Sequence, residues 1–109
     1  MKIVVYFNMM NLSETLVKEI VTAIRTKVDP EKIILFGSAV RDDFSRNSDI
    51  DVALFGIDRE QIYAVEDYLN QSIHSLKDID IICFEKISNE KFKTRILKEG
   101  LVIYERNTR

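Results

Sequence analysis

The sequence is poor in the residues that build covalent cross-links and soft-metal sites: it has one cysteine, one histidine and no tryptophan. A lone cysteine, Cys83, cannot form an internal disulfide, and its place in the apolar run IDIICF predicts a buried strand thiol. His74 has no second histidine or cysteine at ligand spacing, which excludes a zinc site of that type. Neither residue is therefore a candidate for function.

The chain also lacks long apolar runs and an excess of charge of one sign. Sixteen basic and eighteen acidic residues give a formal net charge of -2, with no basic block, so direct nucleic-acid binding is not expected. The run IVVYF near the start is far shorter than a signal-peptide core or a membrane span. We therefore expect a cytoplasmic protein, and 109 residues with 46% hydrophobic side chains predict one domain with its own core.

Three stretches carry apolar residues at the three-to-four spacing of an amphipathic helix. Each is bounded by residues that begin or end helices, such as capping boxes, proline or glycine. The expected boundaries are Asn11 with Glu14 and Asp29-Pro30 for the first helix, Asp58 with Gln61 for the second, and Ser88 or Asn89 with Gly100 for the third.

Four short apolar runs predict buried strands, at residues 32–36, 49–55, 78–84 and 101–105. Together with the helices they predict a single-domain α/β (α+β) fold with no repeat and no linker. The first ten residues are interpreted either as an extra strand or as a region that precedes an alternative start at Met9 or Met10.

Two carboxylates stand at the head of the run DIDVALF, where a buried strand carries apolar residues. Residues two apart in a strand lie on one face, roughly 6 to 7 Å apart, so Asp49 and Asp51 project side by side while Ile50 points the other way. Two such carboxylates repel each other and resist desolvation, which indicates either open solvent or a bound cation. Oxygen ligands of this kind suit Mg²⁺ or Mn²⁺.

A third carboxylate interrupts the later run IDIICF. Asp80 lies beside the first pair if the two strands are neighbours, whereas its competitor Asp78 stands at the loop edge, so Asp80 is preferred. Three converging carboxylates match sites in which two divalent ions, about 3.5 to 4 Å apart, organise an in-line phosphoryl displacement.

Gly37 and Ser38 end the strand expected at residues 32–36. Glycine allows a backbone to approach a phosphate closely, and a helical turn beginning at Ser38 would direct free N–H groups at anionic oxygens. A Gly-Ser pair alone usually marks a turn. Followed at fixed offsets by two aspartates, it indicates a phosphate-binding turn beside a metal site.

The stretch FGSAVRDDFSRNSDIDVALF resembles the signature of the DNA polymerase beta-like nucleotidyltransferases: Gly-Ser, ten residues, Asp-x-Asp, and a later strand aspartate. The segments IDIICF and RILKEGLVIYER resemble the corresponding parts of minimal members, small single-domain proteins often paired with HEPN-domain toxins in prokaryotic toxin–antitoxin modules. The likeness covers about residues 11–106, the expected nucleotidyltransferase domain. It implies a mixed sheet with helices on one face and an active-site cleft on the other.

The resemblance also implies roles for individual residues in a site that holds ATP and two Mg²⁺ ions. The aspartates would bind the ions, the third of them would help to deprotonate the attacking hydroxyl, and the Gly-Ser turn would hold the β- and γ-phosphates. The candidates are Asp49, Asp51 and Asp80 as catalytic and metal ligands, and Gly37, Ser38, Arg41 and Ser48 as nucleotide-binding residues.

The activity implied by the resemblance is transfer of AMP from ATP to a tyrosine of a HEPN RNase toxin, within a complex of the two proteins. Two alternatives stay open: an antitoxin that neutralises its partner by binding alone, and nucleotidyl transfer to a small molecule. Phe55, Ile82 and Phe84 are expected on the face of the aspartates, where they either line an open cleft or are covered by a helix or by the N-terminal strand.

Overall fold

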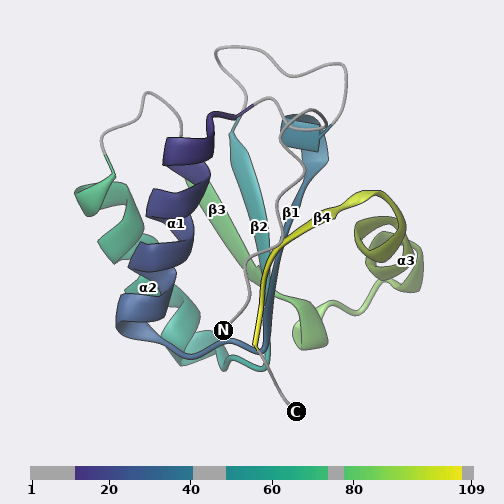
Figure 1. Cartoon of the computed structure of the whole chain (residues 1–109). Helices are drawn as coiled ribbons and strands as arrows, with labels where there is room; N and C mark the ends of the chain where they lie inside the picture. The colour runs from purple at the N-terminus through teal and green to yellow at the C-terminus, as the bar shows by residue number, and fades with distance from the viewer. Residues whose placement is uncertain (1–11, 41–48, 74–77, 107–109) are drawn as a thin grey trace.

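The elements follow one another in the predicted order, and the four strands predicted between residues 32 and 105 are confirmed to within one residue at each end. The computed structural model describes residues 12–40, 49–73 and 78–106, arranged as Figure 1 shows. The elements are α1 (Glu14–Lys27), β1 (Lys32–Phe36), the 3-10 turn η2 (Gly37–Val40), β2 (Ile50–Phe55), α2 (Arg59–Ser72), β3 (Ile79–Cys83), the 3-10 turn η3 (Phe84–Lys86), α3 (Glu90–Glu99) and β4 (Leu101–Glu105).

The four strands form one mixed sheet with the order β3-β2-β1-β4. β1 pairs antiparallel with both β2 and β4, whereas β2 and β3 run parallel. Parallel neighbours need a long crossover connection, which α2 supplies. The predicted fold class is confirmed.

The two faces of the sheet are covered differently. α1 and α2 lie together on one face, where they bury the main core with residues such as Ile20, Val52 and Leu69 (Figure 1). α3 lies on the other face, where Ile96 joins a smaller apolar cluster with Ile34. The structure thus refines the expected arrangement of helices on one face, because the second face is itself too apolar to remain uncovered.

The capping residues agree with the predictions at two helices and differ at the first. The Asp58 N–H donates to Gln61 Oε1 at 3.0 Å at the start of α2, and Asn89 Oδ1 accepts from the Phe92 N–H at 3.0 Å in α3. In α1 the N-cap is Ser13, whose Oγ accepts from the Leu16 N–H at 3.1 Å. The predicted cap Asn11 lies outside the described residues. So do residues 1–10, which are interpreted either as an extra strand or as a region before an alternative start.

Gly100 ends α3 as predicted, but for a different physical reason. Its φ of -72° is open to any residue, so left-handed geometry is not what requires glycine here. A Cβ at this position would instead collide with the Ile34 side chain and would come within 2.5 Å of the Ile96 carbonyl oxygen. Glycine therefore permits the close approach of α3 to the sheet.

The apolar residues expected on the aspartate face are mostly covered. The rings of Phe55 and Phe84 stack with centroids 4.2 Å apart, and both belong to the cluster beneath α3. Ile82 is half-buried and borders a cavity. Within the described ranges no helix has the length and apolar character needed to cross a bilayer.

Candidate functional site

Asp51 and Asp80 lie opposite each other on the parallel strands β2 and β3. The register pairs Ile50 with Ile79, Asp51 with Asp80, and Val52 with Ile81. The isoleucine and valine side chains belong to the core beneath α1 and α2, so strand alternation places both aspartates on the opposite face. The prediction that Asp80 lies beside the first pair on a neighbouring strand is confirmed.

Asp49 precedes β2 and is exposed, and its carboxyl group is within hydrogen-bonding reach of Asp80. Partial burial, followed by the negative charges of Asp49, Glu66 and Asp78, raises the pKa of Asp80 above its usual range. Asp80 remains exposed, so solvent screens part of these effects. The carboxylates therefore form a region of negative potential that favours a cation.

Gly37 brings the backbone of the η2 turn against Asp51. Its φ is +76°, which L side chains rarely adopt, and a Cβ there would lie 2.5 Å from Asp51 Oδ2. The register explains this contact, because Phe36 at the end of β1 is paired with Asp51. Ser38 follows in the same turn and is half-buried. The predicted turn and the predicted carboxylate are thus in direct proximity.

A cavity of about 580 Å³ opens on this face between the carboxylates and α3. Its volume lies within the range of small-molecule sites. Of the predicted residues, three line it, whereas Asp49 and Ser38 do not, and Arg41 and Ser48 lie outside the described residues. The lining residues are Phe36, Gly37, Asp51, Glu66, Asp80, Ile81, Ile82, Phe92, Arg95, Ile96 and Glu99.

Sequence reasoning did not identify the residues that α3 contributes to this cavity. Phe92, Arg95, Ile96 and Glu99 are spaced i, i+3, i+4 and i+7, which places them on one face of a helix. This periodicity was visible in EKFKTRILKE. Nothing local, however, indicated that α3 would lie on the side of the sheet that carries the aspartates.

Glu66 was also missed, and it helps to hold β3 in place from α2. The edge of β3 that faces away from β2 would otherwise expose unpaired backbone groups. Asn70 accepts from the Ile79 N–H at 3.1 Å and donates to the Ile79 carbonyl at 3.3 Å, while Glu66 Oε2 accepts from the Ile81 N–H at 3.0 Å. These contacts fix the backbone on both sides of Asp80.

The donors at this site fit a magnesium ion better than a softer metal, because they are all carboxylates. Within the residues that the structure describes, no group of three or more His, Cys, Asp or Glu side chains is close enough to form a complete metal site by itself. Mg²⁺ is commonly bound by one or two carboxylates together with water and substrate phosphates. The paired Asp51 and Asp80 therefore suit an ion that arrives with its nucleotide.

The raised pKa of Asp80 predicts how this charge affects folding. The folded protein holds a proton on Asp80 more tightly than the unfolded chain does. Stability linked to that proton is present below the unfolded pKa, near 3.8, and is lost as the pH rises through the folded value. Asp80→Asn is therefore expected to raise the thermal midpoint at about pH 7 in a chelator, and the gain should vanish below about pH 3. Circular dichroism melts at both pH values measure this, and a lower midpoint for the variant at neutral pH would contradict it.

Comparison with known proteins places this chain in a family. The family model described as polymerase beta, nucleotidyltransferase matches residues 18–109. A protein of Methanocaldococcus jannaschii, assigned by name as a protein adenylyltransferase, is 33% identical over 98 residues, which cover 84% of this chain and 97% of the relative.

Two solved structures share the fold at lower identity. One is a chain of a toxin–antitoxin complex with AMP-PNP, 20% identical with a TM-score of 0.70, covering 83% of this chain and 73% of the other. The second comes from the complex of an MNT antitoxin with tri-AMPylated HEPN toxin of Shewanella oneidensis, 17% identical with a TM-score of 0.68, covering 87% and 74%. At these identities the likeness concerns the fold.

Proposed function

This chain belongs to the polymerase beta nucleotidyltransferase family, and we propose that it transfers AMP from ATP to a tyrosine hydroxyl of a HEPN-domain RNase toxin, with which it forms a complex. The observation that carries the proposal is the alignment of Asp51 with Asp80 beside Gly37 in one cavity. Support for the acceptor comes from the relative assigned as a protein adenylyltransferase and from the solved complex with an AMPylated HEPN toxin.

Each residue has a distinct task in this proposal. Asp49, Asp51 and Asp80 would hold Mg²⁺, which supplies positive charge against the triphosphate when bound. Gly37 lets the backbone of η2 approach the β- and γ-phosphates, and Ser38 adds its N–H and hydroxyl groups. These contacts orient the α-phosphorus over β2 for attack from the side of β3.

The transfer itself exchanges one phosphorus–oxygen bond for another. The tyrosine oxygen forms a bond to the α-phosphorus, the bond from that phosphorus to the bridging oxygen of the β-phosphate breaks, and pyrophosphate leaves. The proton of the tyrosine passes to the Asp80 carboxylate, which acts as the general base.

The test is labelling of the partner. We expect that incubation of the protein with α-³²P-labelled ATP, Mg²⁺ and a HEPN-domain toxin from the same organism places label on that toxin, and that label disappears when its acceptor tyrosine is changed to phenylalanine. Omission of Mg²⁺ is the control. Absence of label with every nucleoside triphosphate would contradict the proposal.

A further inference from the structure

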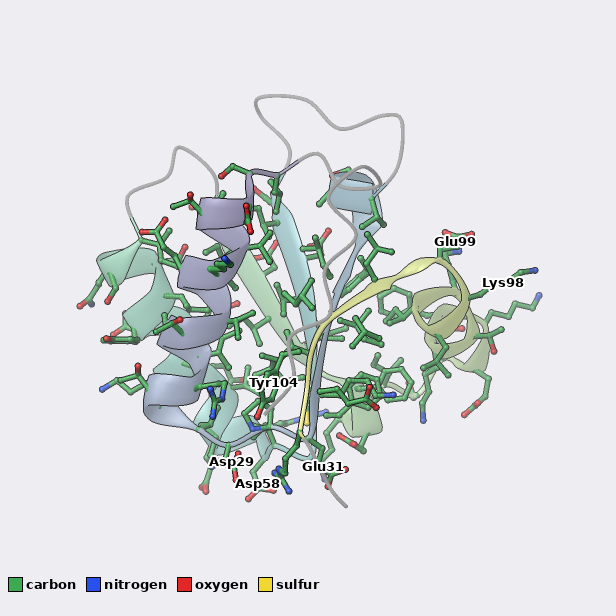
Figure 2. The ribbon with its side chains drawn as sticks, viewed as in Figure 1. Asp29, Glu31, Asp58, Lys98, Glu99 and Tyr104 are labelled. Atoms are coloured by element: carbon green, nitrogen blue, oxygen red, sulfur yellow. The ribbon has the colours of Figure 1, made fainter. Side chains whose placement is uncertain are left out.

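The cavity extends beyond the carboxylates along one face of α3. Phe92, Arg95, Ile96 and Glu99 line it from this helix, whereas Leu97 does not line it and is 56% exposed. Figure 2 shows Lys98 projecting outward from α3, away from the sheet. One face of the helix is therefore directed at the cavity and the rest at solvent.

The chemistry of this region differs from that of the metal site. Its apolar surface comes from Phe36, Ile82, Phe92 and Ile96. The rings of Phe36 and Phe92 meet edge to face at 5.8 Å, and Phe92 keeps 37% of its surface exposed. Among the described residues that line the cavity, Arg95 is the only base. An apolar, aromatic surface with a few polar groups at its border suits a flat ring system with polar edges.

The strand order determines which part of a nucleotide reaches this surface. Gly37 follows β1, Asp51 lies in β2 and Asp80 in β3, so these groups succeed one another across the sheet. An in-line displacement places the leaving pyrophosphate and the attacking oxygen on opposite sides of the α-phosphorus. The reaction axis thus runs across the strands, with pyrophosphate over β1 and the acceptor over β3.

A nucleoside that extends along the strands lies in the plane perpendicular to this reaction axis. The oxygen that links the ribose to the α-phosphorus is roughly perpendicular to the axis along which the acceptor attacks and pyrophosphate leaves. The next row of side chains on this face, one step further along each strand, is Ile34, Ala53 and Ile82, with Ile96 of α3 in the same cluster. This row leads from the carboxylates directly to α3.

The edge of β3 would give the acceptor a separate approach. A second hollow of about 320 Å³ borders Asp80 from that side and includes Tyr63 and Glu66. It contains no residue of α3. Asp80 therefore lies between the cavity beside α3 and the side from which an acceptor enters.

We propose that the face of α3 formed by Phe92, Arg95, Ile96 and Glu99 binds the nucleoside of the substrate, with the base against Phe92 and Ile82. This inference rests on the proposed nucleotidyl transfer and adds to it the location of the base. Arg95 is placed to contact the ribose or the α-phosphate, and the Glu99 carboxylate to accept a hydrogen bond from a ribose hydroxyl or an exocyclic amine.

The experiment compares two ligands and two alanine variants by isothermal titration calorimetry in Mg²⁺ without acceptor. The ligands are ATP and inorganic tripolyphosphate, which lacks the nucleoside. Phe92→Ala is expected to weaken ATP binding about tenfold, the size of a lost base–aromatic contact, and to leave tripolyphosphate binding unchanged. Leu97→Ala, on the same helix but outside the cavity, should change neither. Phe92→Leu keeps most of the apolar volume and provides a second variant if Phe92→Ala unfolds.

Three outcomes would overturn the proposal. Equal losses of affinity for ATP and for tripolyphosphate in Phe92→Ala would mean that Phe92 contributes only to the stability of the fold. An unchanged Kd for ATP in Phe92→Ala would mean that this face of α3 does not bind the nucleoside. A wild-type protein that binds tripolyphosphate as tightly as ATP would have no nucleoside site. The proposed function fails separately, when the wild type binds neither ligand.

Discussion

Asp51→Asn is expected to lower the rate of AMP transfer at least about a thousandfold while the fold remains intact. Asp51 is aligned with Asp80 across β2 and β3 and lines the cavity. Its carboxylate also lies close to Gly37 in the η2 turn. An amide has nearly the same shape but no negative charge, and stabilisation of transition-state charge through a bound metal is worth several kcal/mol. Single-turnover transfer of label from ATP measures the effect, with circular dichroism as the check on folding.

The matched control is Asp78→Asn. Asp78 carries the same charge, lies two residues before Asp80 and is exposed. It borders the hollow at the edge of β3 but does not line the cavity beside α3. Its backbone carbonyl accepts from the Ile50 N–H at 2.9 Å, a contact that the substitution preserves. We expect transfer within a few-fold of wild type. A loss as large as that of Asp51→Asn would mean that Asp78 itself acts in the transfer, either in the role assigned to Asp80 or in the acceptor's approach.

The same carboxylates separate catalysis from neutralisation by binding alone. A double variant, Asp49→Asn/Asp51→Asn, removes two charges from the metal site while keeping the outer surfaces of α1 and α2. If transfer is required, this variant should fail to protect cells that produce the HEPN protein. Protection equal to wild type would support the alternative that complex formation is sufficient.

Gly37→Ala is expected to lower transfer at least about a hundredfold. Two effects combine: the positive φ costs about 1 to 2 kcal/mol for a residue with a side chain, and the new Cβ would lie 2.5 Å from Asp51 Oδ2. The carboxylate must move to make room, and displacement of a reacting group by about 1 Å can cost a hundredfold in rate. Transfer assays and thermal unfolding measure the two effects separately.

Gly56→Ala is the control for the cost of placing a side chain on a residue with positive φ. Gly56 has nearly the same φ, +79°, and its Cβ would meet the side chain of Glu31 at 2.9 Å. Glu31 is an exposed, flexible side chain, which Figure 2 places together with Asp58 at the end of the molecule away from η2. Gly56→Ala should therefore destabilise the fold to a similar degree but retain transfer activity. Similar activities for the two variants would argue against a special role for the Gly37–Asp51 contact.

The sequence determined the features that depend on short-range pattern. Period-two alternation placed Asp51 on the face opposite Ile50 and Val52, because successive strand residues point to opposite sides. The cap at Asp58 was recognisable for a similar reason, since its hydrogen bond to Gln61 joins residues three apart. The first helix shows the limit of such reasoning, because polar residues close together compete to cap it and Ser13 does so in the structure.

Only the tertiary structure decided which of these local features meet. That Asp80 is aligned with Asp51 follows from the parallel pairing of β2 and β3, whose residues are 29 positions apart in the chain. Nothing in the spacing of EKFKTRILKE determined that α3 would line the cavity with Phe92 and Arg95. Hydrophobic burial is non-directional. The apolar face of a helix therefore predicts that this face will be buried, but it does not predict against which surface. The sequence therefore predicted side-chain alternation and helix capping. It did not predict the cavity, because the cavity forms only when segments far apart in the chain pack together.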